Sequence, residues 1–227
     1  MYLNNLISNA LAESLKITGW NQMDYDNGEK ILYVINSNTK EKANILSLSA
    51  GNRIMLGVVG DIVQRCCVLN RNAGKDILTK TSGIVMIDEI ELHLHPSWQQ
   101  QILPTLQKIF PKIQFIVTTH SPQVVSSIPK ECVRIIDNGA VTNIDIQTQG
   151  VEVGDILEGI FGTFPTPFNL EIVQKLNRLD AMVSEGLYDT DEWKKLYQEL
   201  EVYYGKEYGP LAGIVAHANF LRKRRGE

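Results

Sequence analysis

Cysteine is scarce in this chain of 227 residues, which holds only three. Cys66 and Cys67 are adjacent and Cys132 stands apart, so they form no disulfide framework and match no zinc-ligand spacing. Such cysteine usage is typical of a reducing compartment, so we expect a cytoplasmic protein. Long apolar runs are also missing, and the opening residues MYLNNLISNALAESLK carry polar groups throughout. We therefore predict neither a secretory signal nor a membrane partner.

Charge of one sign is not in excess either. The chain has 22 Lys and Arg against 26 Asp and Glu, a net charge of −4. The whole-chain charge thus gives no argument for binding nucleic acid, and any such contact has to be local. Hydrophobic residues at 44% and charged residues at 21% are close to the globular average, which excludes disordered, collagen-like and coiled-coil classes. The length allows one large domain, or a domain with a helical appendage.

The central part of the chain alternates helical and strand patterns. An amphipathic helix starting at Arg53 is predicted by apolar positions that recur every three to four residues, namely Ile54, Val58, Ile62, Cys66 and Leu69. The apolar runs at 84–87 and 113–117 predict strands buried on both faces of a parallel sheet. A single helix between Pro96 and Pro111 would join them as a βαβ crossover. The fold class we expect is therefore α/β.

The flanking segments extend this pattern. Upstream, a short helix ending at Gly19 and a strand at 31–35 are predicted. Downstream, Asn138-Gly139 predicts a hairpin that we expect to close the sheet. Beyond residue 150 the apolar spacing becomes helical, with Gly186 and Gly205 as breakers, which predicts a helical extension over 151–227.

Two acids, Asp88 and Glu89, follow the apolar run at 84–87. The carboxyl end of a parallel strand is where open α/β sheets keep their ligand sites. We expect Asp88 to hold the Mg²⁺ of a nucleoside triphosphate through water, and Glu89 to polarise the attacking water. The alternative is a strand that simply enters a solvated loop.

Two further segments carry candidate chemistry. In LSAGNR the hydroxyl of Ser49, the backbone at Gly51, Arg53 and a helix N-terminus converge, which predicts an anion site, unless Ser49 is only a helix cap. His120 follows the second strand, where an imidazole can hydrogen-bond a phosphate or position a water. The alternative is a structural histidine.

Taken in order, these motifs resemble the carboxy-terminal half of an ABC-class ATPase head, of the kind found in SMC and DNA-repair proteins and in prokaryotic defence ATPases. LSAGNR resembles the signature motif, GIVMIDE the Walker B motif, IELHLHP the D-loop region, and His120 the switch histidine. The resemblance covers about residues 45–146. The form IDEIELHLHP followed by a helical tail is most similar to ATPases of antiphage systems such as PtuA of Septu and its retron-associated relatives.

The resemblance implies the second lobe of a P-loop ABC-type head over residues 1–150, with the helical extension after it. It implies ATP and Mg²⁺ as cofactors, and a composite site between two heads. Asp88, Glu89 and His120 would serve the nucleotide in cis. The signature residues would contact the nucleotide of the partner head; they are Ser49, Gly51 and Arg53. The D-loop residues would lie at the dimer seam; they are Glu91, His93 and His95.

The P-loop itself has no counterpart in this sequence. No G-x-x-x-x-G-K-[ST] occurs, and the nearest pair, Gly74-Lys75, is followed by Asp76 with no glycine five positions before. The lysine and the N–H groups that cradle phosphates are therefore missing. We expect no ATP turnover by this chain alone, as for a truncated copy, half of a split gene, or a fragment.

The function implied is an ATPase subunit whose ATP-dependent dimerisation regulates an effector nuclease of HNH type in antiphage defence. The effector would dock on the C-terminal region, where tyrosines near Trp193 offer an aromatic surface, unless those tyrosines only pack within the chain. Alternatives are the head of a DNA-repair or SMC-like ATPase, and a non-catalytic interaction module.

Two smaller features leave alternatives open. His93 and His95 could ligate a metal together with a carboxylate, although we prefer the D-loop assignment. The basic residues 222–225 are expected to be a solvated helix end, with a nucleic-acid contact as the alternative.

Overall fold

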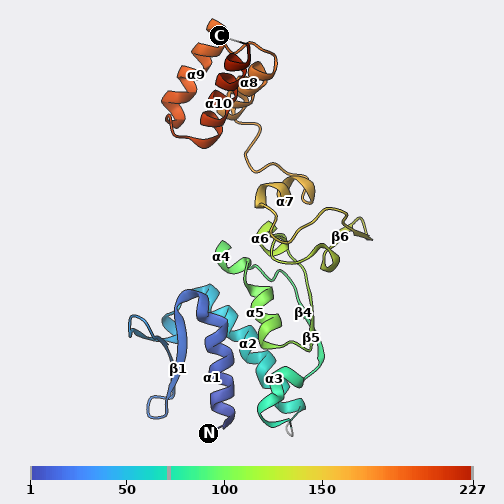
Figure 1. Cartoon of the computed structure of the whole chain (residues 1–227). Coiled ribbons are helices and arrows are strands. Elements are labelled where there is room, and N and C mark those ends of the chain that lie inside the picture. The colour runs from blue at the N-terminus through green and yellow to red at the C-terminus, as the bar shows by residue number, and fades with distance from the viewer. Residues whose placement is uncertain (1, 71–72, 226–227) are drawn as a thin grey trace. The chain divides into compact units, whose positions relative to one another are not determined.

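A computed structural model describes residues 2–70 and 73–225 of the chain, which form two compact units, 1–162 and 163–227 (Figure 1). The division falls later than the expected residue 150. The reason is α7 (Val153–Gly159), which packs against α6 (Pro122–Val125) in the first unit. Ile156 of α7 is fully buried beside Val125. None of the helices that the structure describes is both long and apolar enough to cross a lipid bilayer.

The first unit opens with a helix and a small antiparallel sheet. α1 (Tyr2–Leu15) precedes β1 (Trp20–Asp26), β2 (Ile31–Asn36) and β3 (Lys42–Asn44), which pair in the order β1-β2-β3. The helix and the strand β2 were predicted. β1 was not, because its sequence WNQMDYD is mostly polar and lacks a buried residue.

The helix α2 (Ala50–Leu69) forms the centre of the core of this unit. It begins three residues before the predicted Arg53, because the Ser49 hydroxyl accepts a hydrogen bond from Asn52 N–H and caps the helix. Its buried face is rotated from the predicted one: Ile54 and Leu69 are exposed, and the buried apolar side chains are Met55, Leu56, Val59, Ile62, Val63 and Cys66. α3 (Ile77–Lys80) follows.

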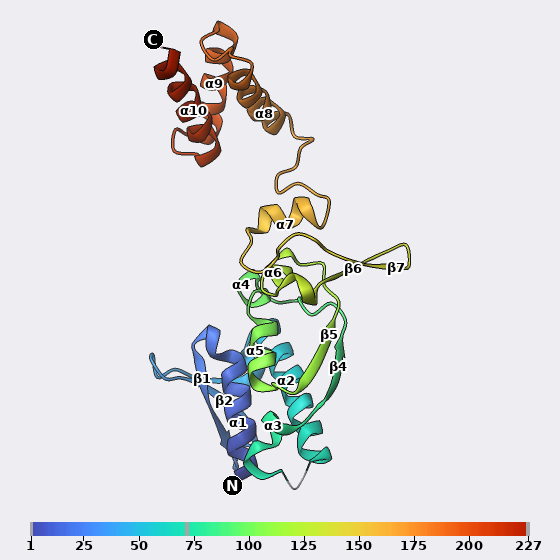
Figure 2. The ribbon, with the colours of Figure 1, turned by 45° about the vertical axis from the view of Figure 1, so that its right-hand side comes forward.

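The predicted βαβ crossover is confirmed. β4 (Gly83–Ile87) and β5 (Ile113–Val117) pair in parallel, and α4 (Pro96–Gln99) and α5 (Ile102–Ile109) lie between them in the chain (Figure 2). The single helix that we predicted is instead two. Pro104 explains the break, because it lacks the N–H that would bond to the carbonyl of residue 100 and its ring crowds that carbonyl.

Only one face of the β4–β5 pair is covered. Val85, Ile87 and Phe115 pack against the core. On the other face Ile84 is 64% exposed, Met86 76% and Ile116 45%. The prediction of strands buried on both faces is therefore wrong for the described residues, since nothing in this unit covers the second face.

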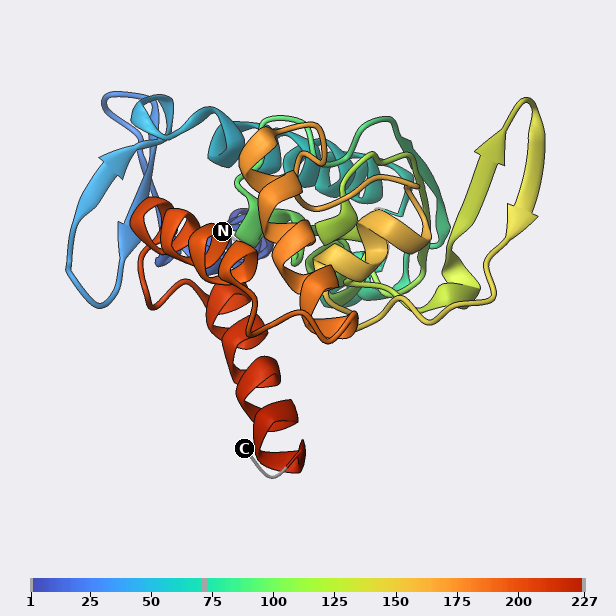
Figure 3. The same ribbon diagram turned by 90° about the horizontal axis from the view of Figure 1, so that it is seen from above.

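The hairpin around Asn138-Gly139 forms but does not close the main sheet. In the part of the chain that the structure describes, β6 (Arg134–Asp137) and β7 (Ala140–Asn143) pair only with each other, and they project from the unit (Figure 3). Both turn residues have the left-handed backbone that a two-residue hairpin loop requires, with φ of 48° and 80°. The turn prediction is confirmed, whereas the expected sheet membership is wrong.

The second unit is a three-helix bundle of α8 (Glu171–Ser184), α9 (Asp191–Tyr204) and α10 (Gly209–Arg225). It has its own apolar core, whose fully buried members include Leu179, Met182, Tyr188, Leu200 and Leu211. Gly186 and Gly205 end α8 and α9 with φ of 77° and 84°, as the breaker pattern predicted.

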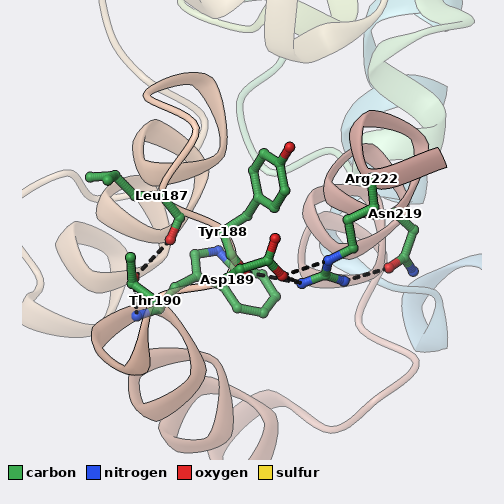
Figure 4. Close-up of polar contacts among 7 residues, drawn as sticks. Leu187, Tyr188, Asp189, Thr190, Asn219 and Arg222 are labelled. Carbon is green, nitrogen blue, oxygen red and sulfur yellow. Dashed lines mark hydrogen bonds and ion pairs between the residues drawn. The ribbon is translucent and has the colours of Figure 1, made fainter. Parts of the chain in front are cut away.

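Arg222 fastens α10 to the loop between α8 and α9 (Figure 4). Its guanidinium donates to Asp189 Oδ1 at 2.8 Å, to the Tyr188 carbonyl at 3.0 Å and to Asn219 Oδ1 at 2.7 Å. The same group lies over the rings of Tyr188 and Trp193. Arg222 therefore departs from the solvated basic end that we expected at 222–225.

Candidate functional site

The candidate site lies where β4 and β5 end. The two strands are parallel with Ile87 opposite Val117, so Asp88 and Glu89 emerge beside the residues that follow β5. Thr118 N–H donates to the Ile87 carbonyl at 3.0 Å and extends the pairing by one step. The acidic pair and the 118–120 segment thus meet at one sheet edge, the usual position of ligand sites in open α/β sheets.

Thr118 connects the two strand ends directly. Its hydroxyl donates to Asp88 Oδ1 and accepts from the Glu89 N–H at 2.8 Å, and its carbonyl accepts from the Ile90 N–H at 3.2 Å. Sequence reasoning missed this residue, although its position directly after β5 was a usable signal. Thr118 fixes the orientation of the Asp88 carboxylate and the backbone of Glu89.

Glu89 has a left-handed backbone with φ of 48°. For a residue other than glycine this conformation costs on the order of 1 kcal/mol and is often found at functional sites. The hydrogen bond from its N–H to Thr118 helps to hold it. Asp88, Glu89 and His120 are all exposed, so a ligand can reach them.

Glu91 contacts the segment after β5 as well. Its carboxylate accepts from the Thr119 hydroxyl at 2.6 Å and from the His120 N–H at 2.6 Å. The side chain is therefore engaged inside its own chain, and its expected place at a seam between two heads stays a prediction.

His93 and His95 differ in their surroundings. His93 has a left-handed φ of 61°, and its carbonyl lies against the signature segment. His95 caps α4, with its Nδ1 2.9 Å from Ser97 Oγ and 3.3 Å from Ser97 N. In the part of the chain that the structure describes, no three His, Cys, Asp or Glu residues gather as a metal site. Nothing there joins the two histidines to a third ligand.

The signature segment LSAGNR packs on the 88–95 loop. A Cβ added at Gly51 would lie 2.9 Å from the His93 carbonyl oxygen, so only glycine fits there without a shift. Ser49 caps α2 and stays exposed, and Arg53 donates to the Leu46 carbonyl at 3.1 Å. The 88–95 loop therefore touches the signature segment through His93 and the His120 segment through Glu91.

The Asp88 carboxylate has a free oxygen that could hold a water bound to Mg²⁺. One of its oxygens holds the Thr118 hydroxyl, which leaves the second oxygen for a metal-bound water. Mg²⁺ at nucleotide sites keeps several waters and takes only one or two protein carboxylates besides the phosphates. A single oriented carboxylate at the strand end satisfies that requirement.

A family profile described as "AAA domain, putative AbiEii toxin, Type IV TA system" matches residues 9–126. That range holds the signature segment, both strand ends and His120. The chain belongs to this AAA-domain family. Membership agrees with the mixed α/β architecture and with the resemblance to ATPase heads drawn from the motifs.

Named relatives narrow the comparison. The chain is similar to "Retron Ec83 probable ATPase" of Escherichia coli, 36% identical over 164 residues, which is 72% of this chain and 30% of that protein. "Retron Vc95 probable ATPase" of Vibrio cholerae serotype O1 biovar El Tor is 34% identical over 169 residues, covering 70% and 32%. "Septu protein PtuA" of Bacillus thuringiensis is 29% identical over 153 residues, covering 63% and 39%. The matches thus span about a third of each relative, and the resemblance to retron and Septu proteins is confirmed.

Proposed function

We propose that this AAA-domain chain supplies the second half of an ATPase head, with Asp88, Glu89 and His120 acting on ATP bound to the same head. The observation that carries the proposal is the meeting of the acidic pair with the His120 segment through Thr118 and Glu91. A carboxylate that activates water and a carboxylate that orients the metal are groups that γ-phosphate hydrolysis uses, and an imidazole can hydrogen-bond a phosphate oxygen.

Each group has a defined role in that reaction. Mg²⁺ bound with ATP would neutralise phosphate charge. Asp88 would hold a water of that metal, and Thr118 keeps the Asp88 carboxylate in place. Glu89 would accept the proton of the attacking water as the water oxygen bonds to the γ-phosphorus and the bond from that phosphorus to the bridging oxygen breaks, so that ADP leaves with that oxygen. His120 donates a hydrogen bond to a γ-phosphate oxygen as the charge shifts.

The signature residues would serve a second head. Ser49, Gly51 and Arg53 lie at the N-terminus of α2, a helix of 20 residues whose first N–H groups favour an anion. In a two-fold dimer they would meet the partner head's γ-phosphate, so ATP would close the dimer. The expected D-loop residues Glu91, His93 and His95 would lie at the seam.

The phosphate-cradling half must come from elsewhere, on a longer chain or on a separate one. The uncovered apolar face of Ile84, Met86 and Ile116 supports this, because parallel sheets are normally covered on both faces. The absence of a G-x-x-x-x-G-K-[ST] pattern from the sequence points the same way.

The names of the relatives suggest the biological setting. We place the assembled ATPase in the cytoplasm, in antiphage defence, where ATP-dependent closure controls an effector nuclease of HNH type docked on the 163–227 bundle. A non-catalytic interaction module is the second candidate, favoured by the missing P-loop pattern.

ATP turnover by the assembled head tests the proposal. Glu89→Gln should lower kcat about a hundredfold or more, because Gln cannot accept the water's proton, and should leave an ATP-bound closed dimer in light scattering. Glu152→Gln, an exposed glutamate at the start of α7, should change neither. Undiminished turnover in Glu89→Gln contradicts the assignment of the base, and an assembled protein without turnover supports the interaction module.

A further inference from the structure

The carboxylate of Glu91 is the acceptor of two hydrogen bonds from the segment that carries His120. Oε2 accepts from the Thr119 hydroxyl and Oε1 from the His120 backbone N–H, both at 2.6 Å. The two donors belong to neighbouring residues of a segment without helix or strand geometry. One side chain thus holds both residues at once.

A carboxylate suits this position better than any neutral group. Ionised Glu has two acceptor oxygens, and bonds from N–H or O–H to a charged acceptor are short and strong. The distances of 2.6 Å agree with such bonds. A Gln side chain would offer one acceptor oxygen and an NH₂ donor, so it could keep the His120 bond only with weaker attraction.

Further hydrogen bonds extend the connection into a closed ring. Thr119 Oγ1 also accepts from the Ser121 N–H at 3.0 Å, and the Ser121 hydroxyl donates to Gln99 Oε1 at 2.6 Å. Gln99 Nε2 donates to the Leu94 carbonyl at 2.9 Å, which returns the ring to the 88–95 loop. The His120 segment is therefore bound to that loop at two places, through Glu91 and through Gln99.

We infer that Glu91 is a positioning residue for His120: it holds the His120 backbone against the 88–95 loop, so that the imidazole stands beside Asp88 and Glu89. For its effect on catalysis this inference rests on the proposed function. The part of the inference that concerns the position of the His120 backbone rests only on the hydrogen bonds of the ring, whose side chains are those of Glu91, Thr119, Ser121 and Gln99. Glu91 itself touches no reacting atom.

Amide hydrogen exchange at His120 in the ¹⁵N-labelled chain tests the positioning directly. Glu91→Ala removes both bonds and should speed exchange on the order of tenfold or more, while Glu91→Gln should give a smaller increase. Glu152→Ala should leave the rate unchanged, and amides of β4 and β5 report whether the variants are folded. Equal His120 exchange rates in the parent, Glu91→Gln and Glu91→Ala overturn the inference.

ATP turnover by the assembled head tests the consequence. Glu91→Gln should lower kcat about tenfold with KM nearly unchanged, because a displaced imidazole affects the transition state more than ATP binding. Unchanged kcat in a variant with fast His120 exchange overturns the positioning role. If the parent assembly shows no turnover, the proposed function fails, and the exchange measurement still decides whether Glu91 holds His120.

Discussion

At the scale of single residues, Gly51 shows how tightly the signature segment is seated. Its backbone does not require glycine, but its surroundings do, because a Cβ there would stand 2.9 Å from the backbone oxygen of His93. Gly57, in the same helix, has nothing within 4 Å of the same added atom. The two glycines therefore provide a matched pair.

We predict opposite effects of alanine at these two positions. Gly51→Ala should lower the free energy of unfolding of the first unit by about 1–3 kcal/mol, since the 88–95 loop must shift. Gly57→Ala should raise it by about 0.5–1 kcal/mol, as alanine favours a helix. Denaturant titration measures both. A Gly51→Ala chain as stable as Gly57→Ala would show that the loop moves away without cost.

The sequence predicted part of the site at this scale. Asp88, Glu89 and His120 could be placed together, since residues after two parallel strands must share a sheet edge. The position of Thr118 directly after β5 placed it at the same edge, but the hydrogen bonds that Thr118 and Glu91 make were not predictable, because a hydrogen bond across about thirty residues leaves no periodic pattern. The left-handed backbone of Glu89 was also hidden, since glutamate carries no mark of it.

At the scale of elements, an ion pair joins α1 to α5. Lys108 Nζ donates to Glu13 Oε1 at 2.6 Å. This hydrogen bond is the main reason that the pKa of Glu13 lies below its ordinary value, with Lys108 and Lys16 charges adding to it and burial opposing it. The Glu13 side chain is 31% exposed, so solvent weakens the pair.

The lowered pKa fixes the direction of a pH effect. The contribution of Glu13 to stability is full above its unfolded pKa of about 4.3, and is lost as pH falls through the lower folded value. Glu13→Gln should therefore lower the free energy of unfolding at pH 7 by less than about 1 kcal/mol, with a slightly lower unfolding temperature, and should match the parent near pH 2. Thermal unfolding from pH 7 to 2 measures this, with exposed Glu131→Gln as the control. An effect of Glu13→Gln that does not change with pH would argue against the pair.

Prediction of the elements was uneven for physical reasons. The crossover followed from run lengths and the β6–β7 turn from Asn138-Gly139, both local signals. Whether that hairpin joins the main sheet depends on distant contacts. The exposure of Ile84 and Met86 could not be anticipated either. An apolar run indicates that a strand is buried, but it does not show which segment covers each face.

At the scale of the whole molecule, each of the two units has a core of its own, so we expect two unfolding transitions. Arg222→Ala should lower the free energy of unfolding of the 163–227 bundle alone, by about 1–3 kcal/mol, since it removes three hydrogen bonds and two ring contacts. Only the transition of the bundle should therefore move to a lower temperature. Lys223→Ala, an exposed neighbour, should change little. Scanning calorimetry of the full chain measures both. A single shared transition would contradict the independence of the units.

The division into an α/β part and a helical part followed from the change in apolar spacing. The position of the boundary could not be predicted, because the apolar spacing of α7 is helical whichever unit it belongs to. Only the packing of α7 on α6 assigns it to the first unit. Periodicity reports the type of an element, and contacts decide its membership.

The seat of Trp193 has a practical consequence for spectroscopy. Its indole stacks on Tyr197 at 5.5 Å between ring centroids and lies beneath the Arg222 guanidinium, while Trp20 and Trp98 belong to the first unit. With phenylalanine at positions 20 and 98, Trp193 would be the one tryptophan of the chain, so tryptophan fluorescence excited at wavelengths that tyrosine does not absorb would come from it alone. The bundle thus carries an intrinsic optical probe, and a partner that disturbs α9 or α10 would change its emission without any attached dye.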